Sequence, residues 1–248
     1  MQATTPSFDG PNPSASRAFS LMELLISVGI VAVLASLLLP AVRGVVTRGH
    51  SAKDAANLRA IAQANIVYAA ENDQRCVIGF TAVPSGLSKT WYSELRPYLD
   101  KGAGSETNRV GCLPVLISPC DPTKGGIRGQ NTVAPDSYAR RSYGINYYTR
   151  EFISGSTKEY RGRKMSVLPL STMIFVGNFP AVQEGTHGIS PNSEASLAAL
   201  PRNWHSVQDM AQFVFLDGHV EMINVDDLQS NGKRYAEAWG PTPSTVSK

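Results

Sequence analysis

The sequence predicts an α+β protein in which one long N-terminal helix packs on an antiparallel β-sheet. Three observations support this fold class. Residues 24–42 carry no charge, residues 43–72 hold no proline and repeat apolar residues at helical spacing, and the last third has two β-rich runs joined by Asp-Gly. A chain of 248 residues is long enough for one sizeable domain beside a membrane helix.

The first expected helical segment covers residues 19–42. Nineteen residues from Leu24 to Val42 carry no charge, and at about 1.5 Å per residue they nearly span a bilayer core of about 30 Å. Glu23 lies at the entrance of this segment, and an ionised carboxylate in lipid requires a partner. Pro40 lies near its exit, where the loss of a helical hydrogen bond predicts a kink.

Residues 43–75 are expected to continue this helix as an amphipathic half. Apolar residues recur there at spacings of three, four and seven, which places them on one helical face. They are Leu58, Ile61, Ala62, Tyr68 and Ala69. We therefore expect one helix from Phe19 to Asn72 whose second half lies on a globular domain.

That globular α+β domain is expected over residues 76–239, followed by a flexible polar tail at 240–248. The segment TWYSELRPYL predicts a short helix bounded by Pro97. Strands are expected at 172–177, 211–216 and 219–224. Asp217-Gly218 between the last two is a strong hairpin signal, because both central residues of such a turn need positive φ.

The composition favours no nucleic-acid partner and no enzyme. A net charge of +3 is slight, and there is no Walker loop, Gly-x-Ser-x-Gly or His-Glu-x-x-His. His205, Asp217, His219 and Glu221 are the candidates for a metal site. Asp217 is accounted for by the turn, and His219 and Glu221 share a strand face without a third ligand at set spacing. No metal and no catalytic residue is therefore predicted, and a core His205 bonded to backbone is favoured. The alternative is a membrane-tethered extracytoplasmic hydrolase or ligand-binding module that uses His205 and Asp217.

Arg17 to Leu25, RAFSLMELL, resembles the processing and methylation site of type IV prepilins and of type II secretion pseudopilins. In that family a polar leader is cut before a Phe, the new amine is methylated, and a Glu four residues later stays in the apolar run. The resemblance places the cut between Ala18 and Phe19 and makes Glu23 the assembly residue. It also matches Pro40 to a proline that often bends the helix in this family. One position departs from the family pattern, because the residue before the cut is usually Gly and here it is Ala18.

The resemblance implies a pilin-like fold and a structural subunit, either a pseudopilin or a minor pilin, of a type IV pilus or type II secretion-like filament. Residues 1–18 would be the leader, and residues 19–42 would lie first in the cytoplasmic (inner) membrane and then in the filament, with the globular domain extracytoplasmic. The implied partners are prepilin peptidase, other pilin or pseudopilin subunits and the assembly platform. A plain single-pass anchor explains the length of the segment but neither Glu23 nor the Phe motif, and a secretory signal peptide has a shorter apolar core.

Three further pieces resemble a divergent pseudopilin-like class: the Trp-containing segment TWYSELRPYL, the turn SPCDP at 118–122 and SYGINYY at 142–148. His205 followed by Asp217-Gly218 resembles the C-terminal region of that class. The extracytoplasmic location implied by the family permits a disulfide, for which Cys112 and Cys120 are the closest pair in sequence, with unpaired thiols as the open alternative. No cofactor is expected. Some pilin-like domains bind calcium in C-terminal loops, and Asp226 and Asp227 are the acids that such an ion would use.

Overall fold

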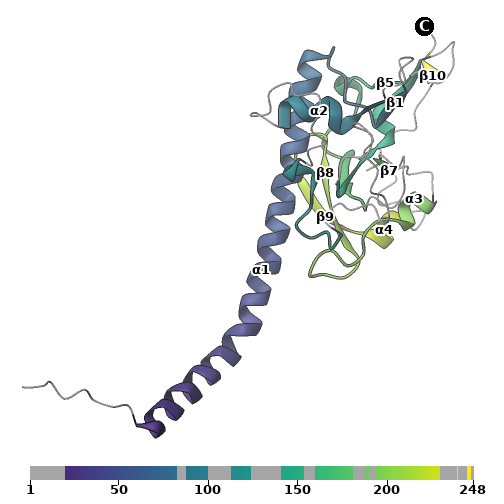
Figure 1. Ribbon diagram of the computed structural model, residues 1–248. Coiled ribbons are helices and arrows are strands. Elements are labelled where there is room, and N and C mark those ends of the chain that lie inside the picture. The colour runs from purple at the N-terminus through teal and green to yellow at the C-terminus, as the bar shows by residue number, and fades with distance from the viewer. Residues whose placement is uncertain are drawn as a thin grey trace, which may run out of the picture. The chain divides into compact units, whose positions relative to one another are not determined.

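The computed structural model describes residues 20–82, 88–99, 113–123, 141–153, 160–180, 188–189, 194–229, 239 and 245–246. The architecture is mixed α+β, with an apolar N-terminal helix and sheets that are mostly antiparallel (Figure 1). The chain divides into two compact units, Met1–Val45 and Val46–Lys248.

Helix α1 runs without interruption over Leu21–Glu71, 51 residues, and the predicted long helix is confirmed over this range. It continues through Pro40, and the bend expected there stays a prediction. The helix ends because Asp73 and Gln74 adopt positive φ angles of 52° and 59°. This left-handed turn lets the Gln74 N–H bond the Ala69 carbonyl at 2.8 Å, which satisfies one of the last helical carbonyls.

The remaining elements of the described residues belong to the second unit. The α-helices are α2 (Trp91–Leu99), α3 (Glu194–Ala198) and α4 (Val225–Gln229), and short 3-10 helices cover Pro114–Leu116, Tyr147–Thr149 and Met165–Val167. The strands are β1 (Phe80–Ala82), β2 (Ser88–Thr90), β3 (Tyr143–Asn146), β4 (Arg150–Ile153), β5 (Tyr160–Gly162), β6 (Ile174–Asn178), β7 (Gly188–Ile189), β8 (Met210–Phe215), β9 (Val220–Asn224) and β10 (Thr245–Val246).

The main sheet has the strand order β7-β3-β6-β8-β9. The pairs from β3 to β9 are antiparallel, as predicted, whereas β7 pairs with β3 in parallel. The three expected strands correspond to β6, β8 and β9, with ends shifted by one or two residues at most. Two smaller sheets have the orders β10-β4-β5 and β1-β2.

The core of the second unit is built around β3, β6 and β8, which are buried on both faces. The C-terminal part of α1 lies along this sheet (Figure 1), with Leu58 and Ile61 fully buried. Gln212 on β8 donates a 2.9 Å hydrogen bond to the Ser51 hydroxyl on the helix. The predicted packing of the amphipathic half on the sheet is therefore confirmed.

Gly177 allows a close approach between neighbouring strands of this sheet. It lies opposite Phe213 in the β6–β8 register. A Cβ atom at position 177 would lie 2.1 Å from Cδ1 of the Phe213 ring. The absence of a side chain there lets the fully buried Phe213 ring cover the β6 backbone.

Helix α2 corrects one prediction, because Pro97 lies inside this helix and not at its boundary. Thr90 caps the helix start: the Ser93 N–H donates to the Thr90 hydroxyl at 3.3 Å, and the Thr90 N–H donates to the Ser93 hydroxyl at 3.0 Å. Trp91 and Leu95 are fully buried. Capping and burial together offset the hydrogen bond that a proline removes.

Candidate functional site

The apolar segment of α1 is the first candidate site. Leu21–Leu38 has a mean hydropathy of 2.5 over 18 residues, and none of it is buried. Its length is about 27 Å at 1.5 Å per residue, close to a bilayer core of about 30 Å. The large apolar side chains are exposed on all sides, from 54% for Ile26 to 79% for Leu21. A helix that is apolar all round is typical of a segment that spans a membrane or is covered by other parts of a protein.

Glu23 lies in the first turn of this helix, with an exposed side chain. Its backbone N–H and that of Leu24 both bond the Ser20 carbonyl, at 3.0 and 3.2 Å. The positive end of the helix dipole favours a carboxylate at this place. Ala18 and Phe19, the expected processing site, lie outside the described residues.

The second candidate site is a buried polar cluster in the second unit, centred on Asp54. Asp54 is fully buried and lies on the same helical face as Leu58 and Ile61. The Tyr143 hydroxyl donates to Oδ1 of Asp54 at 2.6 Å, and Nδ2 of Asn178 donates to Oδ2 at 2.9 Å. Burial and the nearby Asp54 charge raise the pKa of Tyr143, so its hydroxyl keeps the donated proton.

His205 joins this cluster from the loop before β8. Its Nε2 lies 2.9 Å from Oδ1 of Asn178 and 3.7 Å from Oδ2 of Asp54. Oδ1 of Asn178 also accepts the Gln212 N–H at 2.7 Å, which fixes the orientation of the amide. A carbonyl oxygen only accepts, so Nε2 of His205 carries the ring proton.

The other ring nitrogen of His205 has no hydrogen-bond partner among the described residues. The side chain is 0% exposed, and Nδ1 is a buried atom without a donor. Burial lowers the pKa of His205 and outweighs the opposing effect of Asp54. The imidazole is therefore neutral, and a lone pair on Nδ1 faces the protein interior.

Cys120 reaches the cluster from the SPCDP turn. The Cys120 N–H donates to the Ser118 hydroxyl at 3.1 Å, and Oδ2 of Asp121 accepts the Ser142 hydroxyl at 2.6 Å. These bonds hold the turn against the start of β3. The Cys120 sulfur, one Asp54 oxygen and one His205 ring nitrogen all lie within 4.8 Å of one another.

The structure thus brings together His205 and Cys120, which the sequence singled out for separate reasons. His205 is a core histidine, as predicted. The predicted bond to the backbone is wrong, because the side-chain oxygen of Asn178 is the group that faces Nε2. Asp54 was missed. The sequence does place this acid on the helical face that was predicted to be buried, since Asp54 precedes Leu58 by four residues and Ile61 by seven. Cys112 lies outside the described residues, so the disulfide with Cys120 stays a prediction.

The predicted hairpin is confirmed, but its turn differs from the expected one. Strands β8 and β9 pair in register, and Gly218 has a φ of +93°, whereas Asp217 does not have a positive φ. Four residues connect Phe215 to Val220, which makes the turn longer than the predicted two-residue type. In this longer turn Gly218 has a positive φ and Asp217 does not. Oδ1 of Asp217 accepts the His219 N–H at 3.0 Å, which gives this carboxylate a local role in the turn.

The residues weighed for a C-terminal metal or catalytic site belong to different networks. Asp217 contacts His219, with Oδ1 2.6 Å from Nδ1, whereas His205 contacts Asn178. Asp226 forms a 2.6 Å ion pair with Arg202, which lowers the pKa of its carboxyl group. Its charge is therefore already matched by an arginine, which weakens the case for a calcium ion there.

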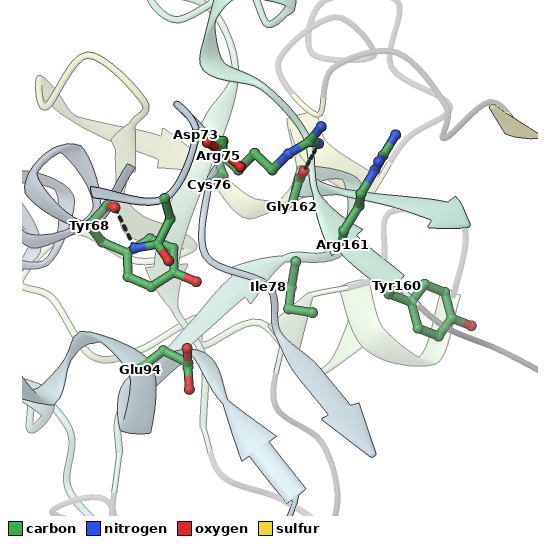
Figure 2. Close-up of a pocket in the computed structure, with 10 residues that line it drawn as sticks. Tyr68, Asp73, Arg75, Cys76, Ile78, Glu94, Tyr160, Arg161 and Gly162 are labelled. Carbon is green, nitrogen blue, oxygen red and sulfur yellow. Dashed lines mark hydrogen bonds between the residues drawn. The ribbon is translucent and has the colours of Figure 1, made fainter. Parts of the chain in front are cut away.

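A pocket of about 280 Å³ lies where α1 ends against β5 (Figure 2). Figure 2 shows Arg75 directed at the Gly162 carbonyl, to which it donates at 2.8 Å. Arg75 and Arg161 both pair with Glu151, at 2.9 and 2.5 Å. In the basic run at 161–164, Arg163 is buried and the exposed Arg161 is already paired with Glu151, whereas Lys164 is exposed.

Comparisons of the chain with protein-family models, with curated proteins and with solved structures found no match.

Proposed function

We propose that this chain is a structural subunit, a pseudopilin or minor pilin, of a type IV pilus or type II secretion-like filament. Prepilin peptidase would cut it between Ala18 and Phe19 in the inner membrane, with the globular pilin-like domain on the extracytoplasmic side. One observation carries the proposal: α1 is a single helix whose first 18 residues are predominantly apolar and exposed, while one face of its later turns is buried in an α+β domain.

The apolar segment needs a different cover in each state of such a subunit. Before assembly, lipid would cover its side chains, since the segment is about as long as a bilayer core is thick. After assembly, the same side chains would pack against the helices of neighbouring subunits. A helix that is apolar on every side suits both environments, whereas a helix with one apolar stripe would suit neither.

Glu23 would set the register between subunits. A carboxylate within an apolar helix is costly in lipid, which favours an arrangement where it meets a positive charge. The amine of Phe19 created by processing would supply that charge, on the same or a neighbouring subunit. Removal of one partner from a buried ion pair costs about 3–5 kcal/mol, because the other charge is left unpaired.

The assembly test is co-expression of the full chain with a prepilin peptidase and an assembly platform, followed by shearing, sedimentation and electron microscopy. We expect filaments from the parent chain and a large loss of sedimented protein from Glu23→Gln, which keeps the shape but removes the charge. Membrane insertion of this variant should be unchanged.

Ser36→Ala is the matched control, because Ser36 is another polar residue of the apolar segment and, among the described residues, its hydroxyl bonds only its own helix, at 2.7 Å to the Val33 carbonyl. It should assemble like the parent chain. Equal filament yield from Glu23→Gln and Ser36→Ala would remove Glu23 from its assigned role. A processed parent chain that forms no filaments would contradict the proposed function itself.

A further inference from the structure

The carboxylate of Asp54 is a buried negative charge without a matching cation in the described part of the chain. It is 0% exposed, and none of the described lysines or arginines forms an ion pair with it. Both of its oxygens accept hydrogen bonds, from Tyr143 and Asn178, as an ionised carboxylate does. Buried charges in proteins are paired or coordinate metals, because an unpaired one is strongly disfavoured.

We propose that Asp54, Cys120 and His205 bind a divalent transition metal, and that zinc is the ion this set of donors fits best. Carboxylate oxygen, thiolate sulfur and imidazole nitrogen are the three donor types found in protein zinc sites. One oxygen of Asp54, the Cys120 sulfur and one ring nitrogen of His205 lie within 4.8 Å of one another. The metal would supply the positive charge that Asp54 lacks.

The surroundings of His205 match those of a metal-binding histidine. Such a histidine usually donates one ring N–H to a carbonyl or carboxylate, which fixes the tautomer and leaves the other nitrogen for the ion. Nε2 of His205 donates to Oδ1 of Asn178, and the buried Nδ1 has no donor among the described residues. Asn178 itself is held by Gln212 and by its bond to Asp54.

The geometry requires only a small adjustment. Zinc bonds of about 2.0–2.3 Å in a tetrahedral site place neighbouring donor atoms roughly 3.3–3.8 Å apart. Donor atoms within 4.8 Å of one another can reach this spacing if side chains move inward by about 1 Å. The His205 ring must also present Nδ1 to the ion, because Nε2, which lies 3.7 Å from Oδ2 of Asp54, donates to Asn178. Three protein ligands leave a fourth position for water, and the partly exposed Cys120 marks the side from which an ion would enter.

A metal ion bound at this site would connect three segments that are distant in sequence. Asp54 comes from α1, Cys120 from the SPCDP turn and His205 from the loop before β8. An ion bound to all three in the folded state, and not in the unfolded state, stabilises the fold by mass action. The three ligands all lie in the second unit, and ion binding there does not depend on filament assembly.

The test uses the full chain in detergent, stripped of metal with a chelator, kept reduced and titrated with Co²⁺ as a spectroscopic probe. We expect one Co²⁺ per chain, with the sulfur-to-cobalt charge-transfer absorption that a thiolate ligand produces. Zn²⁺ should displace the cobalt and raise the melting temperature. If the reduced chain binds no stoichiometric Co²⁺, or binds it without the charge-transfer absorption, the site does not exist.

Variants assign the ligands. Cys120→Ser should abolish the charge-transfer absorption and weaken Co²⁺ binding by more than about 100-fold, beyond the loss typical of an outer-shell partner. Asp54→Asn and His205→Gln should weaken binding comparably. Cys76→Ser and His219→Gln are the matched controls, because each removes the same chemical group elsewhere in the unit, and both should bind like the parent chain.

The assignment remains testable if Asp54→Asn or His205→Gln fails to fold, since Cys120→Ser exchanges one atom and the parent chain carries the spectroscopic signal. Charge-transfer absorption that survives Cys120→Ser, or that is lost in Cys76→Ser, would overturn it. So would a Cys112–Cys120 disulfide found by mass spectrometry in protein isolated without reductant, because the sulfur would then be unavailable to a metal.

Discussion

The Tyr143 hydroxyl donates a 2.6 Å hydrogen bond to Oδ1 of Asp54 and so links strand β3 to helix α1 inside the second unit. Both side chains are fully buried. The bond therefore replaces water at a carboxylate that has no access to solvent. The same hydroxyl accepts a 3.3 Å hydrogen bond from Nδ2 of Asn57, so removal of this single oxygen atom measures both bonds together.

Tyr143→Phe should lower the free energy of unfolding by about 1.5–3 kcal/mol, the range for hydrogen bonds to charged groups. The matched control is Tyr148→Phe, because the Tyr148 hydroxyl is buried without a hydrogen-bond partner in the described part of the chain. That variant should be neutral or slightly stabilising. Thermal melts of the detergent-solubilised full chain measure both, and equal losses would show that the Asp54 contact contributes nothing specific.

His205 predicts a pH dependence of stability in metal-free protein. Burial lowers the pKa of His205 in the folded state below the unfolded value of about 6.5. Between the two pKa values the unfolded chain binds more protons, so the free energy of unfolding rises with pH there. The stability that neutral His205 contributes is thus complete above about pH 6.5 and falls as the pH drops below it, by at most about 1.4 kcal/mol per pH unit.

The measurement compares melts of the parent chain and His205→Gln in chelator, from about pH 8 to about pH 5. Gln can still donate to Asn178 but does not titrate. The parent should lose stability relative to the variant as the pH falls. A relative gain at low pH would mean that a protonated His205 pairs with Asp54, and the neutral imidazole described above would be wrong.

The hairpin turn separates a structural role of Asp217-Gly218 from a chemical one. Gly218→Val should destabilise the chain by about 1–3 kcal/mol, because it forces a β-branched residue to a φ of +93°. No atom would meet the new Cβ within 4 Å, so the cost comes from the backbone and not from a clash.

Asp217→Asn is the control for this variant, since its side-chain oxygen can still accept the His219 N–H. The contact with the His219 ring is exposed and contributes little, so we expect a change within about 0.5 kcal/mol. Thermal melts decide between the two roles. A large loss from Asp217→Asn would identify a carboxylate with a function beyond the turn.

The sequence predicted the elements that local patterns define. Helix α1 follows from apolar residues repeated at helical spacing, and the β8–β9 hairpin follows from β-rich runs on both sides of Asp-Gly. Strand β3 was missed because Gly144 and Asn146 have low strand propensity, and burial between β6 and β7 holds them in place. Pro97 was predicted to bound a helix because proline disfavours a helix interior. The helix continues past it because the burial of Trp91 and Leu95 outweighs this local preference.

The polar cluster could not be assembled from sequence patterns. Asp54, Cys120 and His205 lie far apart in the chain and meet only because α1, the SPCDP turn and the loop before β8 fold onto one sheet. No ligand spacing along the chain encodes such a meeting. The one local trace was an acid on the helical face that carries Leu58 and Ile61.

The mass of the membrane-extracted protein tests the central claim most directly. The full chain is expressed with a prepilin peptidase, and mass spectrometry identifies its first residue. We predict a chain that begins at N-methylated Phe19, with faster conversion for Ala18→Gly, which introduces the Gly that type IV prepilins usually have before the cut. A membrane-inserted protein that keeps residues 1–18 in the presence of active peptidase would contradict the assignment as a prepilin-type subunit.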